Sequence, residues 1–295
     1  MKATLLLLSL VLGAVCAQEY FKYMVYLGWG YDIVSGNPHQ QDNPNGRTLD
    51  PGFKEAVFKI SYGKGQKTSD QRYWVPDGCT AVPLITCSYS SDVSQITSSS
   101  EYTKTLTFEA KLSGSYANFS FSGSYNSMKT TTEIEKKESK YVLAKAICTA
   151  FRGTVGMWSG AIAPSDNFNG FVRDTFGTHV ATVMEFGAKS VAMSQFDKTT
   201  WSKTTSQSRA IGAQASFMQW SGNVNSTSQK QAAEEYNKER TQVENYVVGA
   251  SVVEASGDME KWGNLAQQNP VPVVYKLQPI SDVLISSMFP GLSDI

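Results

Sequence analysis

Two stretches of the chain alternate between apolar and polar or small residues, each with one break near its middle. In residues 104–129, the apolar positions are Leu106, Phe108, Ala110, Leu112, Phe119, Phe121 and Tyr125. In residues 211–225, they are Ile211, Ala213, Ala215, Phe217, Trp220 and Val224. Successive side chains of a strand point to opposite faces, so a period of two places these residues on one face. Both stretches therefore predict amphipathic β-hairpins.

The length and polarity of the predicted hairpins match the wall of a membrane-spanning barrel. A tilted strand needs about 9–11 residues to cross a bilayer, which is about the length of each half of residues 104–129. The apolar face suits lipid, and the polar face, with Glu109 and Lys111, suits a water-filled lumen. Two hairpins from one chain leave unpaired edges, so insertion requires many copies that close one barrel. An ordinary half-buried hairpin in a soluble sheet is the alternative interpretation.

The first residues predict export from the cell. Lys2 precedes a short apolar run, and Val15 and Ala17 are the small residues expected before a cleavage site. A membrane anchor is the alternative, but the run is short for a bilayer-spanning helix. We therefore expect a signal peptide over residues 1–17 and a secreted, extracellular protein with a single domain over 18–295. The 26 basic and 26 acidic residues form no basic block, which argues against a nucleic-acid partner.

Three cysteines lie outside the predicted signal peptide. Cys79 and Cys87 bracket a short segment, and the predicted export favours a disulfide between them. Cys148 is then left over in an apolar run, where a buried free thiol is the simplest interpretation. A bridge to another molecule is the alternative for Cys148.

Helix and strand patterns occur in mixed order along the chain. Apolar spacing and charge pairs predict helices over residues 132–140, 165–176 and 229–242. Alternation predicts strands over 180–186 and 271–277, and a last short helix follows Pro279. Turn-forming residues over 37–52 predict a polar surface loop. This mixture predicts an α+β domain with an antiparallel sheet.

Landmarks along the chain, in the family's order, resemble the membrane-attack-complex/perforin (MACPF) family. The most specific is the tetrapeptide Phe176, Gly177, Thr178 and His179, which lies between a predicted helix and a predicted strand. The others are a glycine-rich segment near the start, Leu27 to Asp32, and a closing region with Trp262, Asn269 to Val273 and Tyr275 to Ile280. The resemblance covers nearly all of the chain after residue 17.

The resemblance implies a bent, twisted antiparallel central sheet flanked by two helical clusters that can convert to β-hairpins. The first cluster would cover about 92–140 and the second about 195–245, which contain the two alternating stretches. Gly249 would be the hinge at the bend of the sheet, where Ala250 replaces a second glycine of the family. Residues 176–179 would have a structural role, with His179 as a hydrogen-bonded structural residue.

The resemblance also implies a pore-forming protein that binds membrane lipids or a membrane receptor. Copies would assemble into a ring on a target-cell membrane and insert a large barrel, as a toxin, defence protein or immune effector. A non-lytic extracellular binding or developmental protein on the same scaffold is the alternative. A secreted hydrolase is a third class, but the sequence has no nucleophile elbow, phosphate loop or zinc motif. We therefore expect no catalytic residue, metal or cofactor.

Two sequons are candidate N-glycosylation sites, at Asn118 and Asn225. Asn118 lies at the tip of the first predicted hairpin, where a glycan would have to cross the hydrocarbon core. Either Asn118 is unmodified, or the protein does not insert in the usual way.

Overall fold

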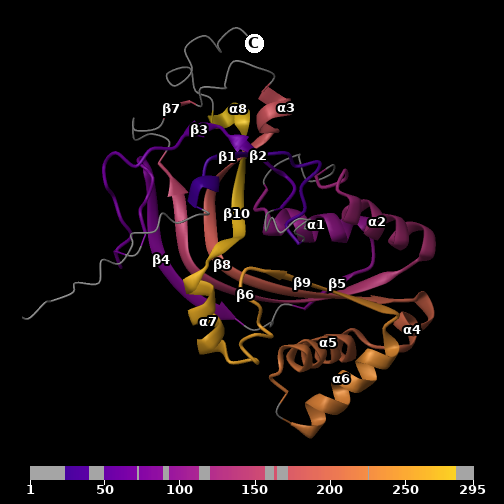
Figure 1. Cartoon of the computed structure of the whole chain (residues 1–295). Coiled ribbons are helices and arrows are strands. Elements are labelled where there is room, and N and C mark those ends of the chain that lie inside the picture. The colour runs from indigo at the N-terminus through magenta and orange to yellow at the C-terminus, as the bar shows by residue number, and fades with distance from the viewer. Residues whose placement is uncertain are drawn as a thin grey trace, which may run out of the picture.

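A computed structural model describes residues 24–39, 50–71, 73–88, 93–112, 120–156, 163–164, 172–224 and 226–283. The predicted signal peptide, Asn118, Phe119 and Asn225 lie outside these ranges. A long, curved antiparallel sheet runs through the described part, with helices on both of its faces (Figure 1). This arrangement confirms the predicted α+β class and the antiparallel central sheet.

Two long strands form the centre of the sheet. They are β6 (Lys140–Val155) and β8 (His179–Phe196), which pair antiparallel from Lys140 opposite Phe196 to Thr154 opposite Val183. Most of their side chains are buried, because helices or loops cover both faces of these strands. The strand predicted over 180–186 is therefore the first half of a much longer one.

Shorter strands pair with the outer edges of this central pair, and two of them follow one another along each edge. β4 (Cys79–Ser88) and β5 (Val93–Ile96) follow one another along β6, while β9 (Gln242–Val248) and β10 (Val271–Pro279) follow one another along β8. β1 (Trp29–Tyr31) pairs with the start of β8, and β2 (Phe53–Ala56) pairs with β1. A separate two-stranded sheet contains β3 (Phe58–Lys59) and β7 (Ala163–Pro164).

The sheet bends where β8 passes from β10 to β9 (Figure 1). Gly187 lies at this point, and a Cβ added to it would collide with the carbonyl oxygen of Cys148 on β6. The ladder between β6 and β8 also shifts its register here, between Thr149 and Phe151. Gly249 directly follows β9 with a φ of +74°, which favours glycine. The close strand contacts at the bend therefore depend on glycine at both positions.

Two groups of helices pack on opposite faces of the sheet. On one face, Tyr102 and Leu106 pack against Leu143 and Met193; on the other, Phe217 belongs to a second apolar core. We name α1 and α2 the first cluster, and α4, α5 and α6 the second cluster. The helices are α1 (Ser99–Glu109), α2 (Tyr125–Lys137), α3 (Val172–Phe176), α4 (Lys198–Lys203), α5 (Ser206–Ser221), α6 (Thr227–Glu239), α7 (Met259–Gln268), α8 (Ile280–Val283) and the 3₁₀ turn η1 (Met24–Tyr26).

Local sequence patterns predicted several helices and strands correctly but misplaced some of their boundaries. The strand over 271–277 and the helix after Pro279 are β10 and α8, and α6 covers most of the helix predicted over 229–242. The helix predicted over 132–140 is the end of α2, because Glu138 adopts a left-handed φ of 52° and β6 begins at Lys140. The prediction of a surface loop over 37–52 is wrong at both ends, where Asn37 and Asp50 are buried.

The disulfide joins Cys87 of β4 to Cys148 of β6, and the buried Cys79 is a free thiol. The predicted bridge between Cys79 and Cys87 is therefore wrong, as is the predicted free thiol at Cys148. Cys79 and Cys87 lie near opposite ends of the single strand β4, where an extended chain separates them by about 26 Å. A disulfide needs Cα atoms about 5.5 Å apart. Cys148 is the cross-strand neighbour of Cys87.

Candidate functional site

Of the first alternating stretch, the structure describes residues 104–112 and 120–129, which contain the end of α1 and the start of α2. The hydroxyls of Ser98 and Ser124 accept hydrogen bonds from the backbone N–H groups of Glu101 and Ser127. These N-caps satisfy donors that the first turn of a helix leaves unpaired, and they help to start α1 and α2 within a strand-like sequence.

The helical form separates the apolar residues of the first alternating stretch. Leu106, Ala110 and Phe121 are fully buried, and Leu112 packs against the same core. Phe108 and Tyr125 are 79% and 72% exposed. Leu106 and Phe108 both lie on α1, where the repeat of 3.6 residues points side chains two positions apart in different directions.

The second alternating stretch is helical as well. Thr205 and Ser208 form a capping box at the start of α5, and Gly222 ends the helix with a left-handed φ of 85°. Ala213, Ala215 and Phe217 are buried, Trp220 and Val224 are half-buried, and Ile211 is 52% exposed. As in the first cluster, the helix leaves part of the apolar set in solvent.

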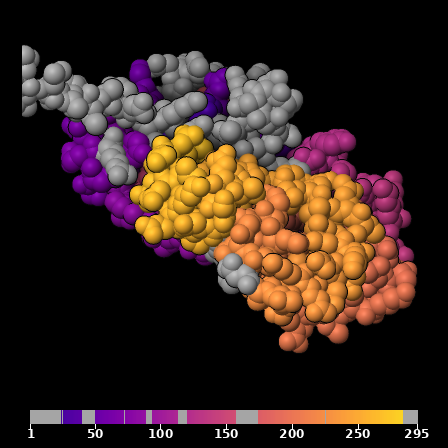
Figure 2. Space-filling model, turned by 60° about the horizontal axis from the view of Figure 1, so that its bottom comes forward, coloured from indigo at the N-terminus to yellow at the C-terminus, as the bar shows by residue number. Residues whose placement is uncertain are grey.

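The helices α5 and α6 pack closely against each other. A Cβ added to Gly212 would lie 2.7 Å from the Cβ of Tyr236, so only glycine fits between the two helices without a shift. Next to this contact, the hydroxyl of Ser216 donates to the side-chain oxygen of Asn237 at 2.7 Å. Figure 2 shows the second cluster, in orange, as a lobe beside the yellow C-terminal elements.

Ion pairs connect the first cluster to the sheet. The carboxylate of Glu109, at the end of α1, lies 2.9 Å from the Nζ of Lys145 and 3.2 Å from that of Lys189. The ammonium of Lys129 on α2 donates to Glu244 of β9 at 2.6 Å. Ion pairs thus connect the first cluster to the three strands β6, β8 and β9.

A single buried arginine organises the start of the second cluster. The guanidinium of Arg209 donates to the backbone oxygens of Trp201 and Thr204 at 2.9 and 2.8 Å. It also donates to the side chain of Gln95 on β5 at 3.1 Å. Arg209 therefore ties the turn between α4 and α5 to the edge of the sheet.

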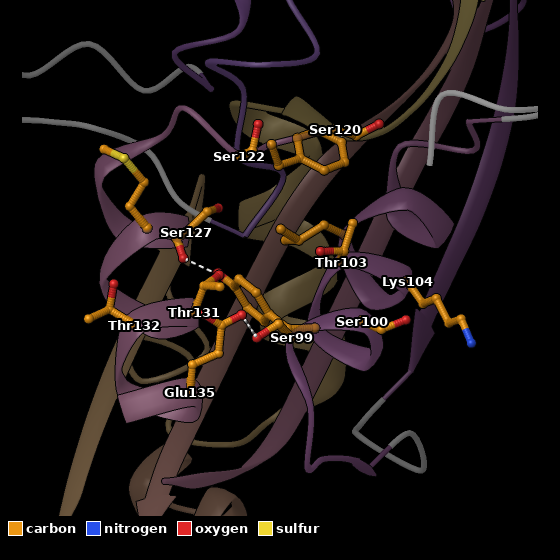
Figure 3. A pocket seen from close by; sticks show the side chains of 14 residues that line it. Ser99, Ser100, Thr103, Lys104, Ser120, Ser122, Ser127, Thr131, Thr132 and Glu135 are labelled. Atoms are coloured by element: carbon orange, nitrogen blue, oxygen red, sulfur yellow. Dashed lines mark hydrogen bonds between the residues drawn. The ribbon is translucent and has the colours of Figure 1, made fainter. Parts of the chain in front are cut away.

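A cavity of about 690 Å³ separates parts of α1 and α2 (Figure 3). Hydroxyl groups of both helices line it, including those of Thr103 and Thr131, together with the apolar side chains of Leu106 and Phe121. The hydroxyl of Ser99 donates across the cavity edge to Glu135 at 2.8 Å. The two helices of the first cluster therefore leave space between them.

The tetrapeptide Phe176 to His179 lies where α3 meets β8. Gly177 has a φ of +77°, and a Cβ there would lie 2.6 Å from the backbone of Tyr31 and Asp32. The hydroxyl of Thr178 is hydrogen-bonded to the Nδ1 of His179 at 2.9 Å. Burial lowers the pKa of His179 to about 4, so the imidazole is neutral at pH 7. These contacts hold β1 against the start of β8.

A buried carboxylate was missed by sequence reasoning. Asp50 accepts hydrogen bonds from the hydroxyls of Tyr31 and Tyr275, and from the backbone N–H groups of Asn37 and Gly52. Burial raises the pKa of Asp50, although these hydrogen bonds oppose the rise. Its position among turn residues gave no signal, because Asp is common in exposed turns.

Within the described ranges, no group of three or more His, Cys, Asp or Glu side chains is placed to hold a metal ion. Across the same residues, none of the helices combines the length and the apolar character needed to cross a bilayer.

The bent sheet with helical clusters on both faces defines the protein class. The model of the MAC/Perforin domain matches residues 16–158 and 164–290. The chain therefore belongs to the MAC/Perforin family, which confirms the resemblance of the tetrapeptide and the flanking landmarks.

Two solved structures share this fold at low sequence identity. GNIP1Aa from Chromobacterium piscinae matches with a TM-score of 0.62 and 13% identity, over 90% of this chain and 53% of that one. A putative cell invasion protein with a MAC/Perforin domain from Bacteroides thetaiotaomicron matches with a TM-score of 0.56 and 12% identity, over 90% of this chain and 59% of that one. The chain thus spans little more than half the length of either protein.

Proposed function

We propose that this chain is a secreted pore-forming protein whose two helical clusters become membrane-inserted β-hairpins. The observation that carries the proposal is the mismatch between sequence period and structure in both clusters. Phe108 and Tyr125 are largely exposed while Leu106 and Phe121 are buried, although the two strands of the predicted hairpin would place all four on one face. The helical state therefore does not gather these apolar residues on one face, whereas the wall of a membrane-spanning barrel requires one apolar face.

The inserted strands follow from the same pattern. The lipid-facing residues of the first hairpin are Leu106, Phe108, Ala110, Leu112, Phe119, Phe121 and Tyr125. Those of the second hairpin are Ile211, Ala213, Ala215, Phe217, Trp220 and Val224. Many copies bind membrane lipids or a membrane receptor, form a ring and close one barrel, because an open sheet edge is not tolerated in lipid.

The sheet bend supports a route from the helical form to the inserted form. The contacts at Gly187 and Gly249 are too close for any side chain, and straightening the sheet there would free the faces on which both clusters rest. We place the hinge at Gly249 and the neighbouring Gly187. In this proposal the chain is not an enzyme, and it acts on target-cell membranes as a toxin, defence protein or immune effector.

The proposal is tested by dye release from liposomes of several lipid compositions, with electron microscopy of the same samples. Leakage together with ring-shaped particles is the expected result. Membrane binding without leakage or rings would instead favour a non-lytic extracellular binding protein. The sequon at Asn118 favours that second candidate, because a glycan at the hairpin tip obstructs insertion.

A reversible lock makes the test specific to the first cluster. A Cβ on Gly123 would lie 2.9 Å from the Cγ1 of Val34, so the pair Val34→Cys and Gly123→Cys is close enough for a disulfide. The locked protein is expected to bind liposomes without leakage until a reductant is added. The controls are the wild type and the two variants that carry only one of the added cysteines, Val34→Cys or Gly123→Cys, each treated with the same reductant. Full leakage by the locked protein would overturn insertion of the first cluster.

A further inference from the structure

Glu109 is a buried carboxylate that contacts nitrogen atoms of side chains from three separate segments. It is the last residue of α1, and its side chain is 5% exposed. Lys145 of β6 and Lys189 of β8 lie 2.9 and 3.2 Å away, and the Nε2 of His39 lies at 3.2 Å. Burial alone would raise the pKa of Glu109, but His39 and the two lysines hold it well below its ordinary value.

Lys189 connects this carboxylate to the bend of the sheet. Its side chain is 2% exposed, and its ammonium donates to the backbone oxygen of Pro38 at 2.6 Å as well as to Glu109. On the backbone, Lys189 lies close to Gly187 and pairs with Val248, directly before Gly249. One side chain thus joins the bend, the segment after β1 and the end of α1.

The second cluster rests on the opposite face in a different way. There, Ala144 and Ala192 of the central strands belong to the same apolar core as Ala213 and Phe217 of α5. When two packed apolar surfaces separate, the favourable free energy of burial decreases gradually with the area that becomes exposed. Separating a buried ion pair leaves charges without partners, which is unfavourable until water reaches them.

We infer that Glu109 and Lys189 form a charge latch that couples straightening of the sheet to release of the first cluster. Withdrawing Glu109 from a closed sheet would remove the carboxylate partner of the buried Lys189 and of the partly buried Lys145, so α1 stays in place while the bend persists. Straightening the sheet at Gly187 and Gly249 moves the Lys189 ammonium away from Pro38 and Glu109 and admits water to this face. The inference rests on the proposed function, since it assigns the regulation of the same cluster.

The latch is tested by hydrogen–deuterium exchange on the protein in solution, without membranes. In Glu109→Gln, which keeps the shape and removes the charge, amides of residues 99–137 are expected to exchange at least about tenfold faster. Amides of β9, over 242–248, are also expected to exchange faster, although the ion pairs of Glu109 reach β6 and β8 and not β9. Residues 206–221 of α5 are expected to change less than about twofold.

Matched variants separate the latch from a general loss of stability. Glu138→Gln removes an exposed ion pair with Lys198 beside the same cluster and is expected to leave exchange unchanged. Lys189→Met is expected to increase amide exchange in the same two regions as Glu109→Gln. Combining the two substitutions is expected to increase the exchange rates little beyond those of either single variant. If Glu109→Gln does not fold, Lys145→Met, which leaves Glu109 and Lys189 in place, is expected to show a smaller acceleration over 99–137.

Two results would overturn the latch. The first is an unchanged rate of amide exchange over residues 99–137 in Glu109→Gln. The second is faster exchange over 99–137 with an unchanged rate over 242–248, which would mean that the first cluster is not coupled to the bend. Because exchange is measured without lipid, it is independent of pore formation. In the liposome assay, Glu109→Gln is expected to shorten the lag before leakage. Absence of leakage from the wild type as well would contradict the proposed function and leave the latch standing.

Discussion

The guanidinium carbon of Arg209 lies 3.7 Å from the centre of the Trp201 ring, and the same guanidinium donates to two backbone oxygens of the turn between α4 and α5. Arg209 is 6% exposed. A planar guanidinium can stack on an aromatic ring and donate in several directions at once, which a lysine ammonium cannot. The start of the second cluster therefore depends on this one side chain.

Arg209→Lys is expected to lower the free energy of unfolding by about 2 kcal/mol, because the stacking and most of the hydrogen bonds to backbone oxygens are lost. Urea unfolding measures the change. Lys203→Arg, at the exposed last residue of α4, is the control and is expected to be neutral. Equal stability of Arg209→Lys and the wild type would show that the turn does not need the guanidinium.

Replacement of the buried Asp50 by alanine is expected to cost about 3 kcal/mol of stability. The hydroxyls of Tyr31 and Tyr275 would lose their acceptor in a buried site, where unsatisfied donors are unfavourable. Removing the hydroxyl as well, in Asp50→Ala with Tyr31→Phe, is expected to recover part of the loss. Thermal unfolding of the wild type, Asp50→Ala and the double variant measures this, and a double variant no more stable than Asp50→Ala would contradict it.

The burial of His179 predicts a loss of stability in acid. Its folded pKa of about 4 lies below the ordinary value near 6.5, so only the unfolded chain takes up the proton in this range. The contribution is complete above about pH 6.5 and is lost as the pH falls toward about 4, by up to about 3 kcal/mol. Urea unfolding at several pH values is expected to show a shallower decline for His179→Gln than for the wild type.

The bridge between Cys87 and Cys148 closes a loop with a sequence separation of 61. Its removal in Cys87→Ala with Cys148→Ala is expected to destabilise the protein by about 4 kcal/mol, because the unfolded chain gains freedom. Peptide mapping without reductant is expected to recover the two cysteines in one linked pair. Burial raises the pKa of the Cys79 thiol to about 12, so alkylation of Cys79 is expected only after unfolding. A linked peptide containing Cys79 would refute this pairing.

Sequence periodicity located the two segments on which the proposed function rests, but it did not give their form in this structure. Residues 104–129 and 211–225 alternate like strands, yet much of their described part lies in the helices α1, α2 and α5. Serine and threonine caps, together with packing on the sheet, outweigh the period of two. The family resemblance implied this helical form, whereas alternation alone predicted hairpins.

Local sequence determined what depends on neighbours along the chain: the strand character of residues 180–186 and 271–277, the short turn at Gly177 and the helix now seen as α6. The tertiary structure alone decided which distant groups meet. Cys87 pairs with Cys148 rather than Cys79, and Glu109 meets Lys189, because antiparallel strand pairing and helix docking bring together residues far apart in sequence. Periodicity reports which face a side chain occupies, whereas the identity of its partner depends on the register and packing of other elements.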